Sequence, residues 1–313
     1  MKLSPSLRAT LLLALVMVFW AGNSIIGRAT AGEIPPLTLA FVRWTGALVL
    51  LAPFAWPKVR ADWPVLRAHW KPVLLLGLLG IGAFNALLYS GLQYTSATNA
   101  LLEQAAVPAL VLILDRLMWS TKSGWLQIAG TAASTVGVVV IVFQGDWHKL
   151  LALHLGTGDA LVLASVVVWS LYTVLLRLRP PVSAIAFVAA TFAIGVVSMA
   201  PLALWEYAEG LRIAWSVKTV LALAYVSVFP SLISYFIYNH AAAELGAARA
   251  GQAITMLPVF GAFLSAILLG ETLVWYHALG IALICFGIAL GLLAFRRQQA
   301  GGAGAKARLE GEA

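Results

Sequence analysis

Residues 97–118 read ATNALLEQAAVPALVLILDRLM, and residues 247–268 read AARAGQAITMLPVFGAFLSAIL. Apolar residues dominate each run, and each is long enough to cross the hydrocarbon core of a bilayer, which takes about 20 residues of α-helix. Each run also has a proline near its middle, Pro108 in the first and Pro258 in the second. The prolines lie about 150 positions apart, as expected of an internal repeat. The two runs therefore predict a helical membrane protein with a duplicated structure.

The composition of the whole chain also indicates a bilayer environment. Hydrophobic residues make up 62% of the 313 positions, and charged residues make up only 10%. A soluble domain carries roughly 45–50% apolar and about 25% charged residues, so this chain would expose large apolar patches in water. Ten apolar runs are long enough to span a membrane with some tilt. They cover residues 9–28, 37–56, 72–92, 97–118, 124–144, 157–176, 183–204, 219–240, 250–270 and 275–295.

We predict an all-α integral membrane protein with ten transmembrane helices, arranged as two inverted five-helix repeats. The repeats are assigned to residues 9–144 and 157–295, and residues 296–313 to a disordered cytoplasmic tail. An odd number of spans per copy inverts the second copy, an arrangement that gives secondary transporters a central site with alternating access. The matches at this offset pair Trp20 with Trp169, Arg28 with Arg177, Trp125 with Trp275, Gly130 with Gly280 and Gly137 with Gly287.

The positive charges predict the orientation of the chain. When the N-terminus is placed in the cytoplasm, most of the 20 Lys and Arg residues fall on the cytoplasmic side. We therefore expect a multi-pass protein of the bacterial inner (plasma) membrane, with both termini in the cytoplasm. The net charge of +8 is attributed to these loops, and nucleic acid is not expected as a partner.

The second half carries the stretch Leu257-Pro258-Val259-Phe260, then Leu269-Gly270-Glu271, then Gly280 and Gly287. With the two repeats, these residues make the chain resemble the drug/metabolite transporter superfamily, EamA type. The stretch Phe-Trp-Ala-Gly-Asn at 19–23 is most similar to bacterial exporters of amino acids, including aromatic ones.

This resemblance implies a secondary transporter that exports small metabolites, with aromatic and neutral amino acids as the leading class. The first repeat departs from the family pattern, because Ser120-Thr121 replaces the Gly-Glu supplied by Gly270-Glu271. Any role of Glu271 is thus not duplicated, which favours a structural role.

Aromatic and amide side chains at similar depths predict a substrate cavity between the halves. Aromatic rings would cover an apolar side chain, while amides and hydroxyls would bond to the polar end of a zwitterion. The alternative for each residue is ordinary packing, hydrogen bonding between helices or a place in the interfacial aromatic belt. The predicted substrate-binding residues are Trp20, Asn23, Phe84, Asn85, Tyr89, Trp169, Tyr172, Tyr235, Asn239 and Gln252.

Arg43 and Glu103 are the charged side chains predicted to lie well inside spans. Charges at such depth are costly and indicate function or a named partner. Similar depths predict an ion pair between them, either as a structural clamp or with Glu103 exchanging a proton or Arg43 binding a substrate carboxylate. Pro108 and Pro258 remove a backbone hydrogen bond at matched positions, so each is either a static bend or a hinge.

The sequence does not favour an enzyme. The five histidines are scattered without metal-ligand spacing, and no phosphate-binding loop is present, so neither a metal nor another cofactor is expected. The expected partners are a small-molecule substrate and the lipid bilayer, with the protein a monomer or, alternatively, a dimer. Open alternatives are export of purines or drugs, a non-transporting membrane protein, and either proton coupling or facilitated diffusion.

Overall fold

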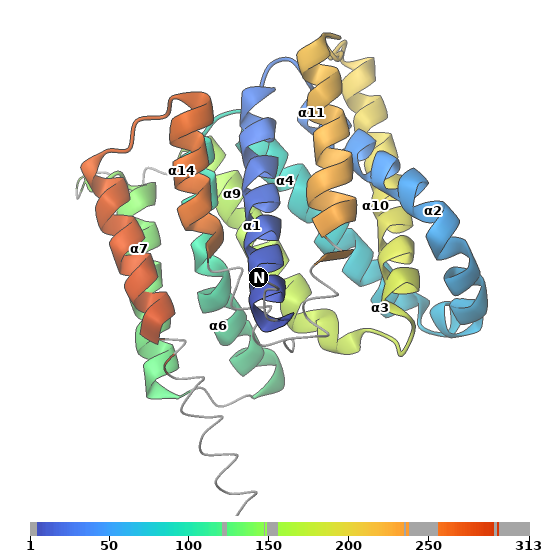
Figure 1. The fold of residues 1–313 in the computed structure, drawn as a ribbon, viewed down its shortest axis with the longest axis horizontal. Coiled ribbons are helices and arrows are strands. Elements are labelled where there is room, and N and C mark those ends of the chain that lie inside the picture. The colour runs from blue at the N-terminus through green and yellow to red at the C-terminus, as the bar shows by residue number, and fades with distance from the viewer. Residues whose placement is uncertain are drawn as a thin grey trace, which may run out of the picture.

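The computed structural model describes residues 5–120, 124–146, 148, 156–234, 236–237, 256–290 and 293. All regular structure in these ranges is helical (Figure 1). The bundle extends from α2 and α10 on one side to α7 and the helix Trp275–Leu290 on the other (Figure 1). The predicted tail from residue 296 lies outside the described residues.

The first half contains five helical stretches, two of which are interrupted by a short segment of different winding. The third stretch passes through a π-helical turn, η1, and the fourth through a 3₁₀ turn, η2. The elements are α1 (Pro5–Ala29), α2 (Pro36–Ala68), α3 (Trp70–Gly77), η1 (Leu78–Ala83), α4 (Phe84–Gly91), α5 (Ala97–Glu103), η2 (Gln104–Ala106), α6 (Val107–Trp119) and α7 (Trp125–Val142).

The second half follows the same order in the residues described. Its third stretch also passes through a π-helical segment, η4. The sequence separation between η1 and η4 equals the separation between Pro108 and Pro258. The elements are α9 (Thr157–Leu175), η3 (Leu176–Leu178), α10 (Ala184–Ala208), α11 (Val217–Ser227), η4 (Val228–Ile233), α14 (Leu257–Leu269) and the helix Trp275–Leu290.

In the part of the chain that the structure describes, each predicted span contains an apolar helix. Within the described residues, 6 helices are long and apolar enough to cross a membrane, and four shorter apolar helices occupy the remaining predicted spans. The helix of the second predicted span does not end at residue 56, because α2 continues to Ala68 through Pro53, Pro57 and Pro64. Burial of Ala55 and Leu66, on the same helix, favours this continuation over a break at the prolines.

Two carboxylates join α2 to α10 at opposite ends. Glu206, near the end of α10, accepts hydrogen bonds from the backbone N–H groups of Leu37 and Thr38 at the start of α2 (3.0 and 2.7 Å). Asp62, near the end of α2, accepts from the backbone and hydroxyl of Ser183, which precedes α10 (2.9 and 2.7 Å). The two helices are therefore antiparallel, and each supplies the carboxylate that satisfies the free N–H groups at the start of the other.

Glycines bring α7 and the helix Trp275–Leu290 into close contact. A Cβ atom on Gly137 would lie 2.8 Å from the carbonyl oxygen of Gly280, and one on Gly287 would meet the carbonyl oxygen of Gly130. Gly130 thus faces Gly287 while Gly137 faces Gly280, so this pair is also antiparallel. Small residues permit such approach of helix backbones in membranes.

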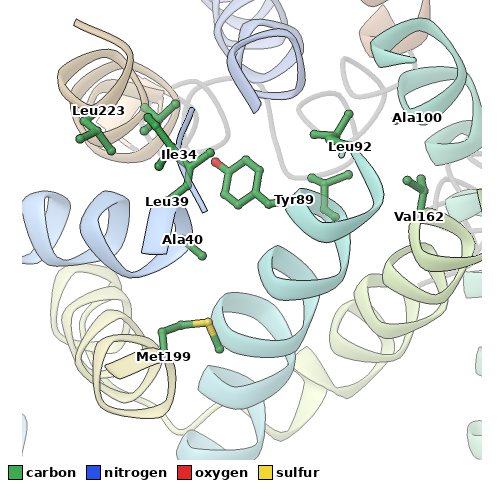
Figure 2. Close-up of a cluster of buried hydrophobic side chains, with 11 residues drawn as sticks. Ile34, Leu39, Ala40, Tyr89, Leu92, Ala100, Val162, Met199 and Leu223 are labelled. Atoms are coloured by element: carbon green, nitrogen blue, oxygen red, sulfur yellow. The ribbon is translucent and has the colours of Figure 1, made fainter. Parts of the chain in front are cut away.

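The largest buried cluster lies where elements from both halves meet. Figure 2 shows the ring of Tyr89 among Leu39, Ile34 and Leu92. Val162 of α9 and Met199 of α10 belong to the same cluster. Packing between the two halves therefore surrounds the middle of the protein, where the polar groups described next are found.

Candidate functional site

Arg43 is the centre of a buried polar network. Its side chain projects from α2 and is only 5% exposed. Nε donates to Oγ of Ser231 at 2.8 Å, and Nη1 donates to Oδ1 of Asn85 at 2.8 Å and to the hydroxyl of Tyr89 at 3.0 Å. The guanidinium carbon lies 4.4 Å from the ring centroid of Trp44. Arg43 is therefore held by groups from both halves of the chain.

Tyr89 extends the network to α1. Its hydroxyl donates to Oδ1 of Asn23 at 2.5 Å, and Asn23 is itself 6% exposed. Asn85 donates its Nδ2 to the backbone oxygen of Ile81 at 2.8 Å, which turns its own oxygen toward Arg43. The structure therefore brings together three of the predicted substrate-binding residues, Asn23, Asn85 and Tyr89, around Arg43.

Sequence reasoning missed Ser231. This residue lies in η4, is fully buried, and donates its hydroxyl to the backbone oxygen of Val226 five residues earlier. Oγ is thereby left to accept from Nε of Arg43. A π-helical turn widens the helix locally and frequently marks functional sites. Ile81 lies in the matching π-helical segment η1, so both such segments contribute to the Arg43 network. In the sequence, a single serine inside an apolar span did not indicate a binding residue.

The predicted ion pair between Arg43 and Glu103 is not formed. No acidic side chain of the described residues lies within 4.0 Å of the Arg43 guanidinium. Asn85, Tyr89 and Ser231 occupy its donor groups instead, and they are neutral. The prediction failed because equal depth in two spans does not place their side chains on facing surfaces.

Glu103 lies on α5 and is fully buried (0% exposed). Within the described residues, neither of its carboxylate oxygens accepts a conventional hydrogen bond. Asp159, at the start of α9, lies near enough to share a hydrogen bond with it once one of the two carboxyl groups carries a proton. Asp159 also accepts from the hydroxyl of Thr95 at 2.5 Å. Sequence reasoning overlooked Asp159 because it stands at the edge of a predicted span.

Three of the remaining described aromatic candidates form a second group. The rings of Phe84 and Trp169 have centroids 4.7 Å apart, and those of Trp169 and Tyr172 lie 5.0 Å apart. All three side chains are only partly buried. Phe84 immediately precedes Asn85, which connects this aromatic group along α4 to the Arg43 network. Trp20 lies apart from the group and donates Nε1 to the backbone oxygen of Pro230 at 3.0 Å.

The structure leaves three candidates untested: Tyr235, Asn239 and Gln252 lie outside the described residues. The hinge candidates are placed only by their backbones. Pro108 and Pro258 each follow the first residue of a helix, α6 and α14. The absent N–H is tolerated there because the first N–H groups of a helix have no partner within it.

A cavity of about 360 Å³ lies between α2 and α11. It is lined by Phe41, Val42, Thr45, Gly46, Leu223, Ala224 and Ser227, none of which was predicted to bind substrate. Its lining is almost wholly apolar. Among the described residues, no group of three or more His, Cys, Asp or Glu side chains is arranged to hold a metal ion.

These features define a bundle of apolar helices that holds a buried arginine between its two halves, bonded to neutral side chains in the described part of the chain. The model of the EamA-like transporter family matches the chain twice, over residues 7–143 and 156–293. The chain therefore belongs to the EamA-like transporter family and is a multi-pass membrane protein with a tandem repeat.

Similar proteins carry transporter names. An "Uncharacterized transporter" of Archaeoglobus fulgidus is 28% identical over 90% of this chain and 96% of its own length. A "Probable amino-acid metabolite efflux pump" of Salmonella typhimurium is 26% identical over 90% and 94%. The "Uncharacterized inner membrane transporter YedA" of Escherichia coli K12 is 26% identical over 87% of each chain. A solved crystal structure shares the fold, with a TM-score of 0.61, 20% identity and coverage of 92% of this chain and 98% of the other.

Proposed function

We propose that the protein is a secondary transporter that exports small metabolites, most of all aromatic and other neutral amino acids. Transport would proceed by alternating access to a central site between two inverted repeats of five helices each. The proposal places the protein in the bacterial inner membrane with both termini in the cytoplasm, as the distribution of Lys and Arg favours.

The antiparallel pairs support the inverted repeat. An axis of twofold pseudo-symmetry in the membrane plane exchanges matched elements and reverses their direction. In the repeat, Gly130 corresponds to Gly280 and Gly137 corresponds to Gly287. Such an axis therefore converts the contact of Gly130 with Gly287 into the contact of Gly280 with Gly137. The carboxylate caps between α2 and α10 obey the same relation.

The buried Arg43, which has no acidic partner among the described residues, is the observation that carries the functional proposal. A cation inside a membrane protein is costly unless an anion or a functional ligand compensates it. The contacts of Arg43 with described residues use Nε and Nη1 only, and we assign the two N–H groups of Nη2 to a ligand. A substrate carboxylate supplies the missing negative charge and fits the guanidinium geometry.

The aromatic group supports the choice of amino acid. Phe84, Trp169 and Tyr172 offer ring surface to an apolar or aromatic side chain. The name of the Salmonella relative, which refers to amino-acid metabolites, agrees with this class. Other small solutes, such as purines or drugs, remain the second candidate, favoured by the partly buried aromatic rings alone.

Counterflow in proteoliposomes tests the proposal. Vesicles preloaded with unlabelled phenylalanine should take up labelled phenylalanine several-fold faster than protein-free vesicles, and a purine or a cationic drug should compete poorly. Arg43→Met should abolish this flux, because the carboxylate loses its counter-charge. Absence of flux for all three solute classes, with folded protein verified by its thermal transition, would contradict the transporter assignment.

A further inference from the structure

We propose that Glu103 and Asp159 together bind one proton that is exchanged during the transport cycle, so that metabolite export is driven by proton uptake. This inference rests on the proposed transport function but concerns a site separate from Arg43. The one-proton pair would replace the role first predicted for Glu103 as the partner of an arginine.

Burial makes the fully ionised pair unfavourable. Glu103 is 0% exposed and Asp159 only 9% exposed. Removing an ionised carboxylate from water without a donor or a cation costs several kcal/mol or more. Two carboxyl groups that share a site do not both ionise readily, because each negative charge opposes the other. A single proton relieves both problems, since a protonated carboxyl donates to the other carboxylate.

The surroundings of Glu103 offer no other compensation. Neither oxygen of Glu103 accepts a conventional hydrogen bond from any described residue, while Asp159 has Thr95 as a donor. The Asp159 carboxylate therefore has a hydrogen-bond donor that Glu103 lacks among the described residues. Glu103 carries the proton, its O–H directed to the Asp159 carboxylate. Loss of that proton to water leaves two buried carboxylates, which favours an arrangement in which α5 and α9 separate and water enters.

Several charged and titratable groups on the elements around the pair have partners elsewhere. On α1, Arg28 donates to the backbone oxygens of Leu92 and Gln93. On α4, Tyr89 is bonded to Asn23 and Arg43. The other groups on these elements are Asp115 and Arg116 of α6, Arg177 of η3, Glu271 beside the start of α5, and Tyr276, His277 and Cys285 of the helix Trp275–Leu290.

Some of these charged and titratable groups have partners in the described residues, and those partners are neither Glu103 nor Asp159. Arg177 forms an ion pair with Asp115 at 2.7 Å. Glu271 accepts from the backbone of Ala97 and Thr98, and a ring nitrogen of His277 lies 3.0 Å from Oδ1 of Asn99. Within the described part of the chain, no Lys, Arg or His side chain lies within 4.0 Å of either carboxyl group. The proton is therefore the cation that the site retains.

Accumulation driven by a pH difference tests the inference. In vesicles with the membrane potential held at zero by potassium and valinomycin, one-to-one exchange lets a difference of one pH unit sustain an about tenfold substrate gradient. The labelled phenylalanine is supplied in the more alkaline compartment. The wild-type protein should move it into the more acidic compartment and accumulate it there. Glu103→Gln and Asp159→Asn should each lose this accumulation, while counterflow, which requires no net proton movement, falls by less than tenfold. Glu209→Gln, at an exposed position, is the matched control and should keep the pH-driven gradient.

The outcomes separate the two proposals. Counterflow without any response to the pH difference in the wild type would overturn proton coupling and leave the transport function standing. Accumulation that follows a sodium gradient, or that persists in both Glu103→Gln and Asp159→Asn, would also overturn it. Loss of counterflow in the wild type would instead contradict the proposed transport function. Thermal unfolding in detergent from pH about 5 to about 9 gives a transport-independent reading: the stability advantage of acidic pH in the wild type should be smaller in Glu103→Gln.

Discussion

The hydroxyl of Tyr89 donates to Oδ1 of Asn23 across 2.5 Å, which joins α4 directly to α1. The same hydroxyl accepts from Arg43, so one oxygen atom connects the cation of α2 to the amide of α1. Tyr89 is fully buried, and its ring packs with Leu39 and Leu92 (Figure 2). The position therefore serves the core through its ring and the polar network through its hydroxyl, and the two roles can be separated experimentally.

Replacement of Tyr89 by Phe should keep the packing and remove the connection. Arg43 loses one acceptor and Asn23 loses one donor, and an unsatisfied buried polar group costs about 1–3 kcal/mol. We expect a lower thermal midpoint in detergent and an increase of at least tenfold in the phenylalanine concentration that gives half-maximal counterflow. Tyr94→Phe is the control, because Tyr94 is 70% exposed. Equal behaviour of the two variants would contradict a role for the Tyr89 hydroxyl.

Arg43 should not tolerate the conservative change to lysine. An ammonium group keeps the charge but lacks the planar fork that bonds to Ser231 through Nε and to Asn85 through Nη1. A hydrogen bond to a charged group contributes about 1.5–3 kcal/mol, so substrate affinity should fall by tenfold or more when the guanidinium is no longer held in place. Isothermal titration of phenylalanine into purified Arg43→Lys measures this effect. The control is Arg67→Lys, at an exposed position, and matching affinities in the two variants would exclude a geometric role for Arg43.

Much of the fold was predictable because its signals are local. Apolar runs of sufficient length and the positions of Pro108 and Pro258 predicted the helices, and each predicted span holds one. The helix break expected after residue 56 was wrong because it followed the end of the apolar run at Trp56-Pro57-Lys58, whereas tertiary packing of Leu66 keeps α2 continuous. Local signals of this kind do not report which faces of distant helices meet.

The polar network around Arg43 was predictable in its members more than in its contacts. Asn23, Asn85, Tyr89 and Arg43 were all candidates, because polar groups inside spans are few and conspicuous. Their mutual geometry depends on rotations of helices far apart in the chain, which no sequence spacing supplies. The same limit explains why Glu103 was paired with Arg43 and not with Asp159.

The contact between Gly137 and Gly280 should be sensitive to a single methyl group. A Cβ on Gly137 would lie 2.8 Å from a backbone oxygen, which cannot move aside as a flexible side chain can. Overpacking of this kind costs about 1–3 kcal/mol, so Gly137→Ala should lower the thermal midpoint of the purified protein. Val136→Ala on the exposed side of the same helix gives the reference. An unchanged midpoint in Gly137→Ala would show that α7 is not closely packed against the helix Trp275–Leu290.

The carboxylate of Glu206 should stabilise the start of α2. It accepts from two backbone N–H groups and from the hydroxyl of Thr38 at 2.7 Å. Loss of an N-terminal cap typically costs about 0.5–2 kcal/mol, and the negative charge adds a favourable interaction with the helix dipole. Glu206→Ala should therefore lower the thermal midpoint, and Glu206→Gln, which keeps one acceptor oxygen, should lower it less. Glu209→Ala, one turn further along the chain and exposed, should have little effect. If Glu206→Ala and Glu209→Ala unfolded at the same temperature, the cap would not contribute to stability.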